Sequence, residues 1–138
     1  MIKDLENKLV KYCTELNFDL SNLSILNALS GGVDSVVLSK LLIELRSKYN
    51  FKLVFAHFNH KMHNKANEMQ RLCKYFAQQN KVQLFNDIIS IPKNHNIEAY
   101  SRSSRYQKLN KIAIENKIQL ILTAHHYDDQ IETLFMKY

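Results

Sequence analysis

Two apolar runs flank the stretch that decides the fold, which reads Ser30-Gly31-Gly32-Val33-Asp34-Ser35. The runs cover residues 23–29 and 36–45, and they indicate a strand before this stretch and a helix after it. Gly31 and Gly32 are the only glycines among the 138 residues. Without a Cβ, the backbone at such a pair turns sharply and can approach another group closely. A strand, a glycine turn and a helix start together predict a site that binds phosphate through backbone N–H groups.

The polar residues of the glycine turn suit a nucleotide. Ser30 and Ser35 can donate hydroxyl hydrogen bonds to phosphate oxygens, beside the positive end of the helix dipole. Asp34 repels phosphate, so we expect its carboxylate to hold Mg²⁺ against the phosphate. A tight turn in which Asp34 or Ser35 caps the helix is the alternative that needs no ligand. The pattern lacks the Gly-Lys-Ser/Thr ending of a Walker A sequence and the third glycine of a dinucleotide fingerprint.

Strands and helices alternate along the rest of the chain. The apolar patterns predict strands at residues 23–29, 53–56, 82–91 and 118–123. They predict helices at residues 2–16, 35–48, 64–79, 97–116 and 128–137. The expected strands are continuous apolar runs, which are typical of a parallel sheet covered on both faces. We therefore expect an α/β fold, an open parallel sheet with helices on both faces, whose ligands bind at the carboxyl edge of the strands.

Composition places few further limits on function. The net charge of +6 is compatible with a polyanionic partner such as nucleic acid, although the basic residues form no dense block. No apolar run approaches the roughly 20 residues of a membrane helix, and the charged first residues do not resemble a signal peptide. We therefore expect a cytoplasmic protein with no membrane partner. The distant pair Cys13 and Cys73 argues against a disulfide framework, a zinc ribbon or a cysteine-held iron–sulfur cluster.

Two polar clusters accompany the middle of the chain. The first follows the second expected strand and reads His57-Phe58-Asn59-His60-Lys61-Met62-His63. Its simple interpretation is a polar loop with histidines at the edge of a strand. A single zinc site is the alternative, although histidines at positions 57, 60 and 63 with no cysteine nearby are not a structural zinc pattern. The second places Glu98, Arg102 and Arg105 on one helix face. These guanidiniums either form a surface ion pair with Glu98 or clamp a phosphate or leaving group, and the spacing leaves both open.

A third cluster, at residues 124–133, contains three carboxylates within five residues, Asp128, Asp129 and Glu132. Asp129 and Glu132 fit a capping box at the start of a helix, which needs no ligand. That interpretation leaves Asp128 and the neighbouring histidines unexplained. Carboxylates this close repel one another unless a cation is near. We therefore expect an acidic pocket for a substrate ammonium group or a second metal ion.

The glycine turn resembles the signature of the PP-loop ATP pyrophosphatases, which split ATP between its α- and β-phosphates. Together with the other clusters, it makes the chain resemble the tRNA(Ile)-lysidine synthetase family. Four motifs in order carry the resemblance: the glycine turn, Asn59-His60, Glu98-Ala99-x-x-Arg102-x-x-Arg105-Tyr106, and His125-His126-x-Asp128-Asp129-Gln130-x-Glu132-Thr133. They extend over nearly the whole chain.

The resemblance implies an ATP-dependent carbon–nitrogen ligase that modifies an isoleucine tRNA with a CAU anticodon. ATP would adenylate the C2 oxygen of the wobble cytidine, and the ε-amino group of free L-lysine would displace AMP to give lysidine. The turn from Ser30 to Ser35 would bind ATP, with Asp34 on Mg²⁺. The implied catalytic residues are Asp34, His60, Arg105 and Asp129. The implied lysine subsite is Asp128, Asp129 and Glu132.

The chain departs from the family in two places. The loop after the second strand reads Asn59-His60-Lys61-Met62-His63 where the family usually has Asn-His-Gly-Leu-Arg. Family members also continue well beyond residue 138. We therefore expect residues 1–138 to be a single PP-loop ATP-binding domain, an incomplete N-terminal catalytic domain. Two alternatives stay open: another PP-loop tRNA-modifying enzyme such as a thiolase, which generally uses paired cysteines, and a truncated, non-catalytic nucleotide-binding module. The oligomeric state is open as well.

Overall fold

The computed structural model describes residues 2–30, 33–59, 66–89, 97–124 and 131–135. The helices are α1 (Ile2–Glu15), the 3₁₀ turn η1 (Leu20–Asn22), α2 (Val33–Tyr49), α3 (Ala66–Gln79) and α4 (Ile97–Glu115). The strands are β1 (Ser24–Ala28), β2 (Lys52–Asn59), β3 (Gln83–Ile88), β4 (Leu120–Ala124) and β5 (Ile131–Phe135). Within these ranges, no helix is long and apolar enough to cross a bilayer.

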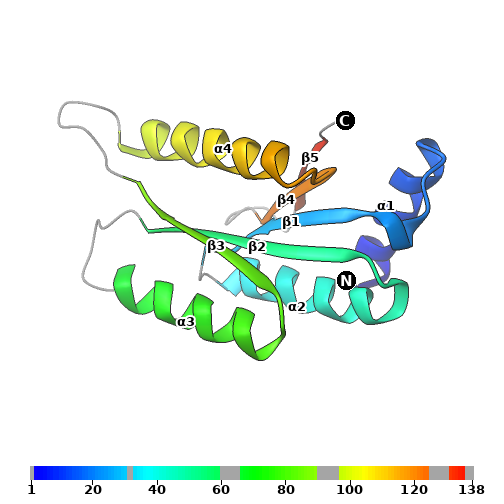
Figure 1. The fold of residues 1–138 in the computed structure, drawn as a ribbon, viewed down its shortest axis with the longest axis horizontal. Coiled ribbons are helices and arrows are strands. Elements are labelled where there is room, and N and C mark those ends of the chain that lie inside the picture. Colours follow the sequence, from blue (N-terminus) through cyan, green and yellow to red (C-terminus); the bar gives the residue numbers. More distant parts are fainter. Residues whose placement is uncertain (1, 31–32, 60–65, 90–96, 125–130, 136–138) are drawn as a thin grey trace.

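The strands form one sheet in the order β3-β2-β1-β4-β5. β1 pairs in parallel with β2 and β4, and β2 pairs in parallel with β3. Helix α4 covers one face of the sheet, while α1, α2 and α3 cover the other (Figure 1). These four strands confirm the predicted α/β fold, an open parallel sheet with helices on both faces.

The fifth strand corrects one sequence prediction. Residues 128–137 were expected to form a helix, but residues 131–135 form β5, which pairs antiparallel with β4. Ile131 lies opposite Ala124, and Phe135 lies opposite Leu120. Without β5, strand β4 would present a row of unpaired backbone N–H and C=O groups along its outer edge. An antiparallel edge strand on an otherwise parallel sheet satisfies them, and such mixed sheets are common.

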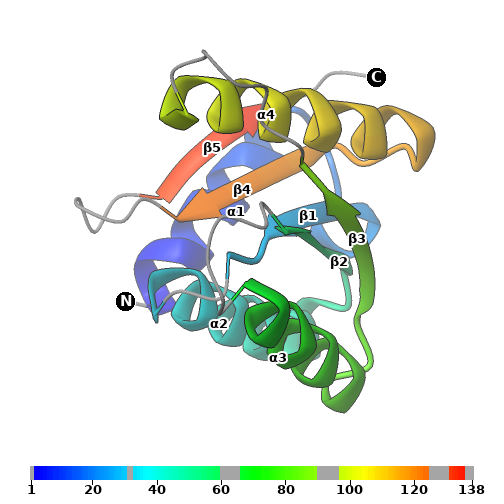
Figure 2. The same ribbon diagram turned by 90° about the vertical axis from the view of Figure 1, so that its left-hand side faces the viewer.

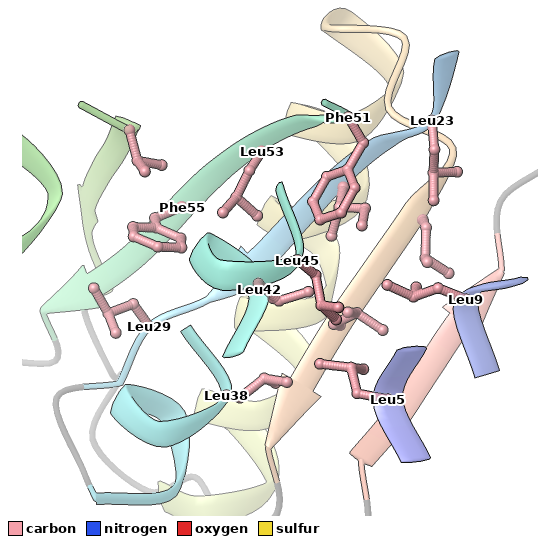
Figure 3. Packing of buried hydrophobic residues seen from close by; sticks show 14 of the residues in the cluster. Leu5, Leu9, Leu23, Leu29, Leu38, Leu42, Leu45, Phe51, Leu53 and Phe55 are labelled. Carbon is pink, nitrogen blue, oxygen red and sulfur yellow. The ribbon is translucent and has the colours of Figure 1, made fainter. Parts of the chain in front are cut away.

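Alternation along the strands directs their side chains into two cores. The larger core lies between the sheet and α1, α2 and α3. Figure 3 shows leucines of α1 and α2 in this core together with Leu53 and Phe55 of β2. In this core Phe55 stacks on Phe76 of α3, with ring centroids 5.9 Å apart. The smaller core lies under α4 and includes Leu26, Val54 and Leu109. Residues one apart on β1 or β2 therefore face different helices.

Each of the four α-helices is followed by a non-glycine residue with positive φ, namely Asn17, Asn50, Lys81 and Lys117. The left-handed conformation lets the backbone N–H groups that follow a helix bond to its last carbonyls. Glycine is the usual residue at this position, because a Cβ makes the conformation unfavourable. This chain has no glycine there and uses asparagine or lysine instead. Its two glycines are both at positions 31 and 32, between β1 and α2 in the sequence.

The strand order places that turn at a reversal point of the sheet. The chain leaves β1 through α2 to reach β2 on one side, whereas β4 lies on the other side of β1. In open α/β sheets, ligands bind beyond the carboxyl ends of the strands at such a point. Figure 2 looks onto the edge at which β1, β2 and β4 end. The start of α2 lies at this edge, directly after the glycine pair.

Candidate ATP-binding site

A single peptide group at the entrance to the glycine turn is held from two sides. The carbonyl oxygen of Leu29 lies 2.7 Å from Nδ1 of His57 in β2. The N–H of Ser30, which belongs to the same peptide, donates to Oγ of Ser35 at 3.1 Å. The Ser30 hydroxyl lies 2.9 Å from the same oxygen. The chain therefore enters the turn in an orientation set by β2 and by the first turn of α2.

A buried chain of hydrogen bonds also joins β1 to α2. Nδ2 of Asn27 donates to Oγ of Ser39 at 2.7 Å, and that hydroxyl donates to the carbonyl of Ser35 at 2.7 Å. Asn27 and Ser39 are completely buried. Sequence reasoning missed both residues, because Asn27 lies within an apolar run and Ser39 within a helix. A polar side chain in the middle of an apolar strand is the signal that was available.

Asp34 is the second residue of α2, and its side chain is partly exposed. A carboxylate in the first turn of a helix interacts favourably with the helix dipole. No hydrogen bond or ion pair joins Asp34 to another residue in the described ranges. Those ranges also contain no group of three or more His, Cys, Asp or Glu side chains that could hold a metal ion. A Mg²⁺ ion at Asp34 would therefore need oxygens from a phosphate or water.

Arg105 extends from α4, the helix that covers the opposite face of the sheet from α2. Its guanidinium carbon lies 5.7 Å from the centroid of the Tyr106 ring. Nε of Arg105 is buried and has no hydrogen-bond partner among the described residues. The backbones of Glu98 and Arg102 lie in the same helix, but their side chains lie outside the description. The choice between an ion pair of Glu98 with Arg102 and a phosphate clamp therefore stays open.

Two buried groups beside the glycine turn are neutral at pH 7. His57 has a side chain only 4% exposed, and burial holds the pKa of its imidazole below the usual value. Sγ of Cys73 in α3 lies 3.6 Å from Nδ1 of His57, and burial raises the pKa of this thiol to about 11. A neutral imidazole and a protonated thiol suit a structural role rather than nucleophilic chemistry.

Asn59, the first residue of the Asn59-His60 pair, holds the end of β2 against α3. Its Nδ2 donates to Oδ1 of Asn67 at 2.9 Å and to Oε1 of Gln70 at 2.8 Å. Its carbonyl accepts from the N–H of Ile89, which follows β3. Asn59 therefore fixes the point where the chain leaves the sheet before residues 60–65.

Several predicted site residues lie outside the described part of the chain. These are Gly31, Gly32, His60, Asp128 and Asp129. The backbone of Val33 begins α2 and that of Glu132 lies in β5 opposite Thr123, but neither side chain is described. Because Glu132 lies in a strand, its interpretation as the third residue of a helix with Asp129 in a capping box is wrong. The acidic pocket itself stays a prediction.

The chain was compared with protein families and with curated proteins. Residues 2–138 match the family described as the PP-loop domain. The tRNA(Ile)-lysidine synthase of Streptococcus gordonii is 32% identical over 133 residues, covering 96% of this chain and 31% of that protein. The tRNA(Ile)-lysidine synthase of Lactiplantibacillus plantarum is 40% identical over 113 residues, covering 80% of this chain and 25% of that protein. The chain therefore spans less than a third of the length of these curated relatives.

A comparison with solved structures supports the same fold. A U34-tRNA thiolase from Methanococcus maripaludis superposes with a TM-score of 0.68, at 20% sequence identity. The superposition covers 91% of this chain and 46% of the thiolase. At this identity the likeness shows the fold and carries no further statement about chemistry.

Proposed function

Because this chain belongs to the PP-loop domain family, we propose that it binds ATP through residues 30–35 and uses it to modify tRNA. The observation that carries the proposal is the peptide at the end of β1 that His57 and Ser35 hold, which leads toward the start of α2 at the reversal point of the sheet. Backbone N–H groups and the start of α2 would bind the phosphates. The carboxylate of Asp34, which has no partner in the described ranges, would hold Mg²⁺ against them.

The reaction that we propose is the one named for the curated relatives, the formation of lysidine. ATP would transfer AMP to the C2 oxygen of the wobble cytidine in a CAU-anticodon isoleucine tRNA, releasing pyrophosphate. The amino group of free L-lysine would then attack C2, and AMP would leave. The guanidinium of Arg105 and the imidazole of His60 would stabilise charge that develops on the phosphate. Such a reaction uses cytoplasmic substrates, and the net charge of +6 suits a tRNA partner.

The carboxylates at residues 128–132 support lysine as the second substrate. Lysine carries two ammonium groups at the start of the reaction, and a pocket for it needs carboxylates. Asp128, Asp129 and Glu132 would form this pocket. Residues 125–130 follow β4, whose end lies beside the end of β1 in the sheet. The nucleotide and the lysine would therefore meet at the same edge.

The cysteines weigh against the alternative of a thiolase. Cys13 lies in α1 and Cys73 in α3, and both are buried. Burial raises the pKa of both thiols, so neither is poised to carry sulfur. A nucleotide-binding module without catalysis is the other alternative, since the chain spans less than a third of its curated relatives.

The release of AMP from labelled ATP tests the proposal. We expect release to require both free L-lysine and the CAU-anticodon tRNA. Asp34→Ala should abolish release, whereas Asp129→Ala should mainly raise the lysine concentration needed for half-maximal rate. Asp4→Ala removes an exposed carboxylate from the first turn of α1 and should change neither. AMP release that does not depend on lysine would refute the lysidine assignment, and ATP binding without any turnover would favour the module.

A further inference from the structure

We propose that His57 is a positioning residue of the ATP-binding turn. Its Nδ1–H holds the carbonyl of the Leu29–Ser30 peptide, while Ser35 holds the N–H of the same peptide. The inference rests on the proposed function for its effect on ATP, but the positioning itself is a property of the free protein. None of the motifs discussed above gives His57 a role in the site.

The contacts of His57 settle which nitrogen carries the proton. A carbonyl oxygen can only accept, so Nδ1, 2.7 Å from the Leu29 oxygen, must donate. The thiol of Cys73 therefore cannot donate to Nδ1, and its sulfur, 3.6 Å away, is at most a second acceptor. Nε2 is then unprotonated, and it is buried without a partner among the described residues. A proton on Nε2 would put an uncompensated charge in the core, so the neutral Nδ1–H tautomer is favoured.

The held peptide determines the direction of the chain at the start of the turn. A peptide group is planar, so fixing its C=O and its N–H fixes the orientation of the whole unit. β2 supplies one contact and α2 the other, and the N–H of Leu29 continues the sheet by donating to Ala56 at 2.8 Å. The turn is thus entered in a fixed direction before a ligand arrives. Fixing a binding segment in advance lowers the entropic cost of binding.

Hydrogen exchange at the Ser30 amide, measured without nucleotide, tests the positioning directly. In His57→Asn, the amide nitrogen Nδ2 is bonded to Cγ, as Nδ1 of histidine is, so the variant keeps a hydrogen-bond donor at nearly the same place. His57→Leu has no donor there. We expect exchange at Ser30 to accelerate by about three- to tenfold in His57→Leu, which matches the loss of one neutral hydrogen bond. His57→Asn should restore most of the protection. Cys73→Ala, which alters the same cluster but not the bond to Leu29, should leave it unchanged.

A second pair of variants keeps the test decisive if His57→Leu does not fold. His57→Gln carries the same amide one methylene farther from the backbone, so its donor does not coincide with Nδ1. We expect Ser30 to exchange faster in His57→Gln than in His57→Asn, at equal global stability measured in urea. Equal exchange at Ser30 in these two variants, or in His57→Leu and the unmodified protein, would overturn the proposal.

The dissociation constant of MgATP, measured by calorimetry, tests the consequence for binding. We expect it to rise by about three- to tenfold in His57→Leu and His57→Gln, and to stay near the original value in His57→Asn and Cys73→Ala. If the unmodified protein binds no ATP, the proposed function fails, while the exchange data still decide the positioning. If exchange changes as expected but the dissociation constants do not, His57 positions the peptide without affecting ATP, and the inference is refuted for binding.

Discussion

Buried hydrogen bonds beside the glycine turn depend on both of their partners. Asn27 and Ser39 are each completely buried, and one hydrogen bond of 2.7 Å joins them. Removing one partner leaves a buried polar atom unpaired, which costs more than the bond itself contributes. Oδ1 of Asn27 already has no partner among the described residues. Substitutions at this pair should therefore be strongly non-additive.

The first prediction measures that coupling with a double-mutant cycle. Ser39→Ala should lower the free energy of unfolding by about 1–3 kcal/mol, because Nδ2 of Asn27 loses its acceptor. Asn27→Leu combined with Ser39→Ala should cost less than the sum of the two single changes, since the pair becomes apolar. Urea unfolding of the four proteins gives the coupling energy. Additive changes would show that the two side chains do not interact as described.

The second prediction is that the free energy of unfolding depends on pH through His57. The folded state holds the pKa of His57 below its usual value of about 6.5, which the unfolded chain retains. Between these two pKa values the unfolded state binds more protons, so stability falls as the pH drops through this window and is highest above it. We expect the free energy of unfolding to decrease from pH 7.5 to pH 5.5. In the His57→Asn variant the same quantity should decrease less over this range. The other five histidines are common to both proteins, so the difference reports on residue 57. Parallel pH profiles would contradict this expectation.

Sequence reasoning at the residue scale located the glycine turn but not the residues that hold it. Two adjacent glycines between a strand and a helix are a local pattern, visible in a short window. The contact between His57 and Leu29 depends on the parallel pairing of β1 with β2, which places Ala28 opposite Ala56. Residues 28 positions apart cannot be paired from local periodicity. Asn27 was predictable only as an unexplained polar residue in an apolar run.

At the scale of the elements, the helices end in the left-handed conformation without a glycine at that position. Lys81 and Lys117 adopt φ of 55° after α3 and α4. In both cases the next N–H bonds back to the helix, from Val82 to Ala77 and from Ile118 to Ala113 at 2.9 Å. This geometry is the Schellman ending of a helix, in which glycine is favoured. Lysine is retained there at an energetic cost of about 1 kcal/mol.

The third prediction follows from these helix ends. Lys81→Gly and Lys117→Gly should each raise the free energy of unfolding by up to about 1 kcal/mol, because the left-handed strain disappears. Lys111→Gly removes the same side chain from an exposed position inside α4 and should lower stability by about 1 kcal/mol. Thermal unfolding of the three variants compares them directly. A loss of stability in both capping variants would contradict the stated role of the backbone conformation.

The predicted elements agree with the structure where a local pattern decides them. The helices predicted at 35–48, 64–79 and 97–116 match α2, α3 and α4 to within about two residues, because each buries one apolar face and ends at a turn. Two interpretations fail. Residues 57–59 were assigned to a polar loop but are buried in β2, and residues 128–137 were assigned to a helix. Ile131 and Leu134 are spaced as on a helix face, whereas pairing with the open edge of β4 is a long-range interaction that periodicity does not report.

At the scale of the whole molecule, the strand order determines which parts of the chain can reach one ligand. β1 and β4 are neighbours, so their carboxyl ends lie side by side, although the paired residues are about 95 positions apart in the sequence. β3 lies at the far edge of the sheet from β4, and much of it is exposed. α1 packs on the sheet through Leu5, Leu9 and Cys13. A nucleotide at the reversal point would contact the chain at the carboxyl ends of β1 and β4. It would not contact β3 or α1.

The fourth prediction is the exchange footprint of MgATP on the whole chain. We expect MgATP to slow amide hydrogen exchange in peptides covering residues 29–36, because the phosphates would bind the N–H groups at the start of α2. Peptides covering α1 and β3 should exchange at the same rate with and without nucleotide. Asp34→Ala, measured at the same ATP concentration, should lose most of the protection, since the shared Mg²⁺ would be lost. Protection that is strongest at β3 would place the nucleotide at the opposite edge of the sheet and contradict both the binding turn and the reversal point as its site.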